Sequence, residues 1–102
     1  MVEGLDYVLL RFDGINLALP RGEVLGVESC SSILRNETEA PAVGVVALGN
    51  QELPVYVLSG KLELLTGGPN NRRFCVCLDT SDSSERYAIA CDVVEQLSLI
   101  HI

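Results

Sequence analysis

The sequence contains no tryptophan, a single histidine and few aromatic residues of any kind, which make up 5% of its 102 residues. This scarcity removes the usual stacking platforms for bases and sugars. Basic residues are also few, because seven Lys and Arg stand against 14 Asp and Glu, for a formal net charge of −7. Phosphate backbones are bound by clustered cations, and here only Arg72 and Arg73 are adjacent. We therefore expect no nucleic-acid partner.

Long hydrophobic runs are missing as well. No apolar stretch approaches the roughly 20 residues that span a bilayer. The first residues include Glu3 and Asp6 and lack the positive charge of a secretory signal. We therefore expect a cytoplasmic protein without membrane insertion. A chain of 102 residues supports one hydrophobic core, so we expect a single domain over residues 1–102.

The sequence offers little for catalysis. A nucleophilic Ser or Cys needs a base, usually histidine, and the one histidine is His101. The phosphate-loop, dinucleotide-binding and His-Glu-x-x-His motifs do not occur. The acidic pairs lie in polar segments, where solvent leaves the acidity of a carboxyl group unchanged. Such a group is ionised at neutral pH and is therefore a poor general acid. We expect a binding protein that is not an enzyme and holds no cofactor or metal.

Four cysteines are present. A reducing compartment favours free thiols. Cys75 and Cys77 alternate with Val76, which places both sulfurs on one face of a predicted strand. We interpret the cysteines as small buried apolar residues. The alternative is a small redox or metal protein that uses Cys75, Cys77 and Cys91.

Short apolar segments separated by turn residues predict a mainly β protein of about five to seven strands, arranged as a small barrel or sandwich. Asp13-Gly14 and Gly49-Asn50 are typical hairpin turns. Pro54 predicts an edge or bulge position for its strand, because proline cannot donate to a ladder. The predicted hairpins are Tyr7–Phe12 with Ile15–Leu19, Val43–Leu48 with Leu53–Leu58, and Phe74–Leu78 with Tyr87–Val94; Val24–Val27 is a further strand.

The remaining segments are predicted to be a short helix and loops. Leu58, Leu62 and Leu65 recur at helical spacing before Gly67-Gly68-Pro69, which indicates one to two helical turns. The polar segments 29–41 and 79–85 are predicted surface loops. Asp92 stands inside an apolar strand, where an inward carboxylate needs a hydrogen-bond donor.

The order of these pieces resembles the CheW-like family, adaptor proteins that couple chemoreceptors to the histidine kinase in bacterial chemotaxis. The resemblance covers about residues 6–99. Its most specific block is 44–58, which keeps a Gly, a Leu, a Leu-Pro-Val and a Leu in register. The first hairpin and the Asp92-Val93-Val94 triplet also match. The resemblance implies small five-stranded, SH3-like barrels with one short helix.

Three differences from the family pattern fall at functional positions. The usual Asn-Leu-Arg-Gly turn is Ala47-Leu48-Gly49-Asn50 here. It lacks the arginine, whose planar guanidinium can donate several hydrogen bonds to a partner. Val57 occupies the place of an Asp. Family members typically continue beyond residue 102 with further strands. We expect a compact relative or a truncated chain, whose sheet edge around residues 97–102 is completed by homodimerisation.

The resemblance implies a non-enzymatic signalling adaptor or scaffold in chemotaxis or a related motility or pilus pathway. The implied partners are a histidine kinase regulatory domain, a chemoreceptor or another signalling protein. A diverged scaffold outside the receptor array is the alternative. For Val24 and Val27, ordinary core packing is an equal alternative. By analogy with the positions that the family uses, the candidate partner-binding residues are Val24, Val27, Ala47, Leu48, Gly49, Asn50 and Gln51.

Overall fold

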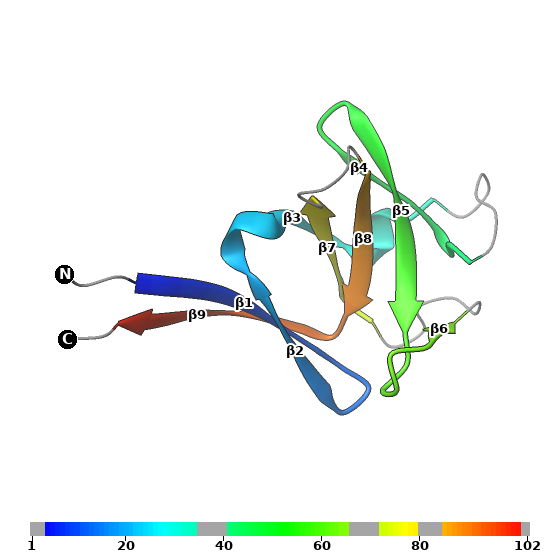
Figure 1. Ribbon diagram of the computed structural model, residues 1–102. Coiled ribbons are helices and arrows are strands. Elements are labelled where there is room, and N and C mark those ends of the chain that lie inside the picture. Colours follow the sequence, from blue (N-terminus) through cyan, green and yellow to red (C-terminus); the bar gives the residue numbers. More distant parts are fainter. Residues whose placement is uncertain (1–3, 35–40, 66–71, 80–84, 101–102) are drawn as a thin grey trace.

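The structure is a computed structural model of the 102-residue chain, and it describes residues 4–34, 41–65, 72–79 and 85–100. The fold is mainly β, with curled sheets that form a half-barrel (Figure 1). None of the helices in these ranges has the length and apolarity that crossing a bilayer requires. The elements are β1 (Gly4–Phe12), β2 (Ile15–Pro20), η1 (Arg21–Glu23), β3 (Val24–Ser29), η2 (Cys30–Ser32), β4 (Gly44–Leu48), β5 (Gln51–Leu58), β6 (Leu64–Leu65), β7 (Phe74–Asp79), β8 (Arg86–Cys91) and β9 (Val93–Ile100).

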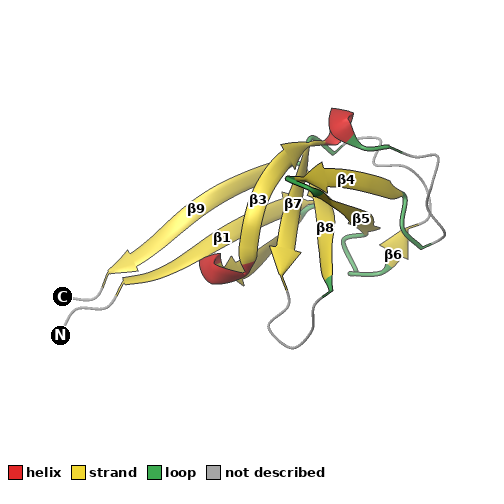
Figure 2. Cartoon of the chain, turned by 90° about the horizontal axis from the view of Figure 1, so that it is seen from above, coloured by secondary structure: helices red, strands yellow, loops and turns green. Residues whose placement is uncertain are grey.

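A three-stranded antiparallel sheet has the order β2-β1-β9. Asp13 and Gly14 both have positive φ, as a two-residue type I′ turn requires, so the predicted first hairpin is confirmed. β1 pairs with β2 only as far as Tyr7, whereas its ladder with β9 extends to Gly4. The β1–β9 ribbon therefore projects beyond the rest of the sheet (Figure 2).

The second sheet has the order β3-β7-β8-β5-β4, with the short β6 paired to β5. Its β4–β5 and β7–β8 pairs are the second and third predicted hairpins, and both are confirmed. Leu34, just after β3, pairs with Val45 of β4 through two backbone hydrogen bonds of 2.8 Å. This bridge joins the two ends of the strand path and holds the sheet in its curled form.

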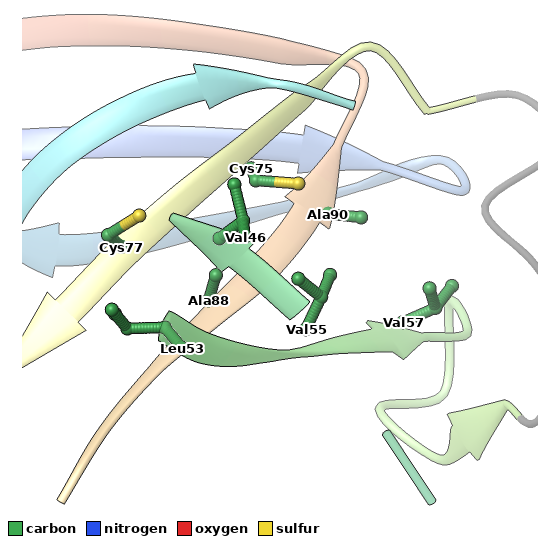
Figure 3. Packing of buried hydrophobic residues seen from close by; sticks show 8 residues of the cluster. All are labelled: Val46, Leu53, Val55, Val57, Cys75, Cys77, Ala88 and Ala90. Carbon is green, nitrogen blue, oxygen red and sulfur yellow. The ribbon is translucent and has the colours of Figure 1, made fainter. Parts of the chain in front are cut away.

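Two hydrophobic cores lie on opposite faces of β7 and β8. Four consecutive residues of each strand, 75–78 and 88–91, are buried, because neighbouring side chains point to alternate faces and both faces are covered. The core inside the half-barrel, called the barrel core, is shown in Figure 3 and contains Val46, Leu53, Val55, Val57, Cys75, Cys77, Ala88 and Ala90. The core between the two sheets, called the sheet core, contains Val8, Leu10, Phe12, Val76, Leu78, Ile89 and Cys91.

The predicted helix over 58–65 is wrong. Ser59 is instead the start of a turn, in which its Oγ accepts hydrogen bonds from the Lys61 and Glu63 amides at 3.1 and 3.2 Å. Leu62 has a φ of 61°, a value that breaks a right-handed helix. The leucines at 62, 64 and 65 are exposed, so their helical spacing has no core to pack against.

The edge or bulge position predicted from Pro54 is also wrong, since β5 lies between β4 and β8 and its register with β4 is regular through Pro54. In a two-residue hairpin the residues that flank the turn, here Leu48 and Gln51, form a hydrogen-bonded pair. Hydrogen-bonded and non-hydrogen-bonded pairs then alternate along the ladder, so Val45 and Pro54 form a non-hydrogen-bonded pair. The pairing with β8 begins one residue later, at Val55. Proline is therefore tolerated inside the sheet because no ladder bond needs its missing amide.

The predicted strand 87–94 is two strands, because the chain bends at Asp92 and passes from one sheet to the other. The Asp92 amide donates to the Arg11 carbonyl oxygen at 2.8 Å, which starts the pairing of β9 with β1. Its Oδ1 is buried, and no hydrogen-bond donor in the described part of the chain reaches this oxygen, although an inward carboxylate needs one. Of the predicted loops, residues 35–40 and 80–84 lie outside the described residues, as do Gly67-Gly68-Pro69 and His101.

Candidate functional site

β3 carries two of the candidate partner-binding residues and begins the strand path of the larger sheet. Val24 packs against the sheet core, whereas Val27 is 45% exposed and Leu25 is 37% exposed. The pairing with β7 is irregular between Val24 and Gly26, which leaves Leu25 as the extra residue of a bulge. Val24 is therefore partly buried against the sheet core, while Val27 and Leu25 present apolar surface to solvent.

A groove of about 280 Å³ lies between β3 and the three-stranded sheet. Its walls are mixed, because Val and Leu side chains stand beside the long polar side chains of Arg21 and Gln96 and beside polar backbone atoms. We call it the β3 groove. The lining residues are Val8, Arg21, Val24, Leu25, Gly26, Val27, Val94 and Gln96.

The β4–β5 turn approaches β3 through Leu48. A Cβ built on Gly26 would lie 3.2 Å from Leu48 Cδ1, so the glycine leaves the space that Leu48 occupies. Leu48 also packs against the barrel core. Leu48 therefore lies next to β3, the strand that carries Val24 and Val27, although it packs against the barrel core and Val24 packs against the sheet core.

The other predicted turn residues do not all join this region. Ala47, Gly49 and Asn50 are exposed, and Gly49 supplies the positive φ that the two-residue turn needs. Gln51 faces β8 instead, where its Oε1 accepts a hydrogen bond of 2.6 Å from Arg86 Nη1. Arg86 also forms an ion pair of 3.6 Å with Asp79.

Sequence reasoning missed six residues of the β3 groove, which are Val8, Arg21, Leu25, Gly26, Val94 and Gln96. Leu25 has a detectable signal, because it belongs to the same apolar stretch as Val24 and Val27. Arg21, Val94 and Gln96 have none, since they come from a turn and a distant strand that only the packing of the two sheets brings to β3.

A second hollow, of about 420 Å³, lies on the larger sheet. Tyr56 and Tyr87 meet there edge to face, with ring centroids 6.0 Å apart. Such pairs add about 0.5–1.5 kcal/mol beyond the area that they bury. The hollow contains none of the candidate partner-binding residues, and its lining is Pro41, Tyr56, Leu58, Leu64, Tyr87 and Ile89.

All four cysteines are unbridged. Cys75 and Cys77 face the barrel core from the same side of β7, as predicted, and Cys91 lies in the sheet core (Figure 3 shows the first two). Cys30 is the one cysteine that is not fully buried, and its Sγ lies 3.7 Å from that of Cys75. In the described ranges, no group of three or more His, Cys, Asp or Glu side chains is placed to hold a metal ion.

Burial changes the acidity of these thiols. It raises the pKa of Cys91 to about 12, with the nearby Cys30 and Asp92 adding to the effect and Arg72 opposing it. Burial likewise raises the pKa of Cys75 far above its ordinary value of 9.0, and the neighbouring Cys30 adds to the rise. Both thiols therefore stay protonated in the folded protein under conditions that ionise them in the unfolded chain.

We expect stability to fall in alkaline solution for this reason. Above pH 9 the unfolded chain has released the two protons that the folded protein keeps, so unfolding is favoured as the pH rises towards the folded-state pKa values. The expected loss is about 1.4 kcal/mol per pH unit for each thiol. Urea titrations at pH 8, 9 and 10 with a reductant measure it. Cys91→Ala should reduce the slope, and an unchanged slope would contradict the assignment.

The chemistry of the β3 groove suits a protein segment. Its valine and leucine side chains can contact an apolar side chain, and the Arg21 guanidinium can donate to a carbonyl or carboxylate in the same groove. No protein-family model matches the sequence, and no curated protein matches it.

Proposed function

We propose that the protein is a non-enzymatic adaptor of the CheW-like type, which binds a protein partner on the surface formed by β3 and the β4–β5 turn. The observation that carries this proposal is the contact region of Gly26 and Leu48, beside the exposed Val27. It brings the β4–β5 turn next to β3, and both segments carry residues that the resemblance nominated. The mainly β half-barrel is compatible with the small barrels of that family.

The proposed partner is the regulatory domain of a histidine kinase or a chemoreceptor, in the cytoplasm, in a chemotaxis, motility or pilus pathway. The mechanism is burial of complementary apolar surface, which is the usual source of affinity at the centre of a protein interface. The altered turn lacks an arginine, so apolar contact with Val27 and Leu25 carries more of the proposed binding than ion pairing. A scaffold in another pathway would use the same surface with a different partner.

Val27→Glu tests the proposed surface. The substitution places a carboxylate where an apolar contact is proposed, and burying an unpaired charge is costly. We expect the affinity for a histidine kinase regulatory domain to fall at least tenfold in calorimetric titration. Val27 is 45% exposed in an edge strand. The free energy of unfolding should therefore change by no more than about 0.5 kcal/mol.

Leu64→Glu is the matched control, because Leu64 is 50% exposed, lies on β6, which pairs with β5, and lines the second hollow instead of the β3 groove. It adds the same charge outside the proposed surface, so the affinity should stay unchanged. Equal weakening by both variants would contradict the location of the site. Failure of the unaltered protein to bind the kinase domain at high micromolar concentration would exclude classical coupling.

The homodimer stays a prediction. β9 pairs with β1 on one side, and no other strand in the described ranges pairs with it. An edge strand of this kind offers free amides and carbonyls to a second chain. Ile102 lies outside the described residues, and of the side chains at 97–100 nothing is described. Light scattering at tens of micromolar is the test, and a monomeric mass would contradict the prediction.

A further inference from the structure

Two cysteines from distant parts of the chain meet at the rim of the barrel core. Cys30 opens η2, directly after β3, and Cys75 lies in β7, 45 residues later. Their sulfurs are 3.7 Å apart, which is van der Waals contact for two thiols. The Cys30 amide donates to the Arg73 carbonyl oxygen at 2.9 Å, so the backbone of η2 is already hydrogen-bonded to the chain that leads into β7.

The two thiols differ in access. Cys75 has no exposed surface and sits among the apolar side chains of the barrel core, whereas Cys30 is half-buried at the edge of the same core. A small oxidant can therefore reach Cys30, whereas Cys75 is shielded from solvent. This arrangement of an accessible cysteine beside a second thiol is typical of redox-sensitive pairs.

We propose that Cys30 and Cys75 form a redox-sensitive pair, in which a hydroperoxide oxidises Cys30 and Cys75 then closes an intramolecular disulfide. In the first step the Cys30 sulfur attacks one peroxide oxygen. The O–O bond breaks, Cys30 becomes a sulfenic acid and the peroxide leaves as an alcohol or, from hydrogen peroxide, as water. In the second step the Cys75 sulfur attacks the Cys30 sulfur. The S–S bond forms, the S–O bond breaks, and the leaving hydroxide takes the Cys75 proton as water.

The disulfide would covalently tie η2, and with it the end of β3, to β7. The bond closes a long loop between residues 30 and 75, and a crosslink of this kind restricts the unfolded chain. Oxidation should therefore raise the melting temperature of the protein, and a thiol reductant should reverse the rise. This inference depends on the contact of the two sulfurs and not on the identity of the binding partner.

The test treats the folded protein with a small molar excess of hydrogen peroxide and counts free thiols after denaturation. We expect the count to fall from four to two, with loss of two hydrogen atoms from the intact mass. Digestion without reduction should yield one linked pair of peptides, containing Cys30 and Cys75. Non-reducing electrophoresis should show a single chain.

Two alanine variants make the test specific. Cys77→Ala keeps both members of the pair and should form the disulfide at an unchanged rate, although Cys77 lies in the same strand and core as Cys75. Cys30→Ala should retain its three thiols under the same treatment. A peptide linking Cys30 to Cys91, a disulfide between two chains, or four unreacted thiols in the unaltered protein would each overturn the proposal.

Discussion

Replacing Arg72 by alanine should lower the free energy of unfolding by about 2–4 kcal/mol. Its guanidinium donates from Nη1 to the Ala90 carbonyl oxygen at 3.1 Å and from Nη2 to the Leu58 carbonyl oxygen at 2.9 Å. Its Cζ also lies 4.9 Å from the centre of the Phe12 ring. One half-buried side chain thus links β5, β8 and β1, so its removal weakens the attachment of the two sheets to each other.

Arg73→Ala is the matched control, because the Arg73 side chain is exposed and the hydrogen bonds of this residue to Cys30 and Cys91 are made by its backbone. A surface substitution of this kind changes stability by no more than about 0.5 kcal/mol. Urea unfolding at neutral pH measures the free energy of unfolding of both variants. The two values can be compared if the slope of this free energy against urea concentration is the same in both variants. Equal, small effects of the two substitutions would show that Arg72 is as dispensable as its neighbour.

Replacing Gly44 by alanine should cost about 2–3 kcal/mol, since overfilling a packed site forces its neighbours to move. A Cβ at Gly44 would lie 2.8 Å from the Leu34 carbonyl oxygen and would also clash with Ile33 Cγ2. That carbonyl accepts the Val45 amide in the bridge that joins the segment after β3 to β4. The added methyl group therefore acts at the contact that holds the larger sheet in its curled form.

Gly22→Ala provides the comparison, because a Cβ at Gly22 meets no atom within 4 Å. It should leave the free energy of unfolding nearly unchanged. Hydrogen exchange adds a local measurement, in which Gly44→Ala should speed the exchange of the Leu34 and Val45 amides more than that of the β1–β2 ladder. Uniform exchange in both regions would mean that the bridge has no separate role.

The hairpins could be predicted because their signals are local. Asp13-Gly14 and Gly49-Asn50 specify tight turns through backbone conformations that few residues adopt, and the flanking apolar residues alternate as strands do. The short helix was predicted wrongly for the same local reason. Leucines at helical spacing indicate a helix only where a core covers them, and Leu62 lies on a turn with its side chain exposed.

The candidate site was predictable only in part. Val27 and Leu48 could be nominated from the resemblance, but their common location depends on the curling of the larger sheet, which brings Leu48 against Gly26. The cysteine pair shows the same limit. Cys75 and Cys77 stand out in the sequence, yet the thiol that Cys75 contacts is Cys30, which no spacing rule connects to it.

The sequence by itself determined that the protein is built from short strands, where three of its hairpins turn, and that its charge does not suit a nucleic-acid partner. Those properties follow from composition and from interactions between near neighbours. The tertiary structure decided that β7 and β8 are buried on both faces, that Arg72 links two sheets and that Cys30 meets Cys75. These features arise from contacts between residues distant in the chain, for which the local pattern carries no information.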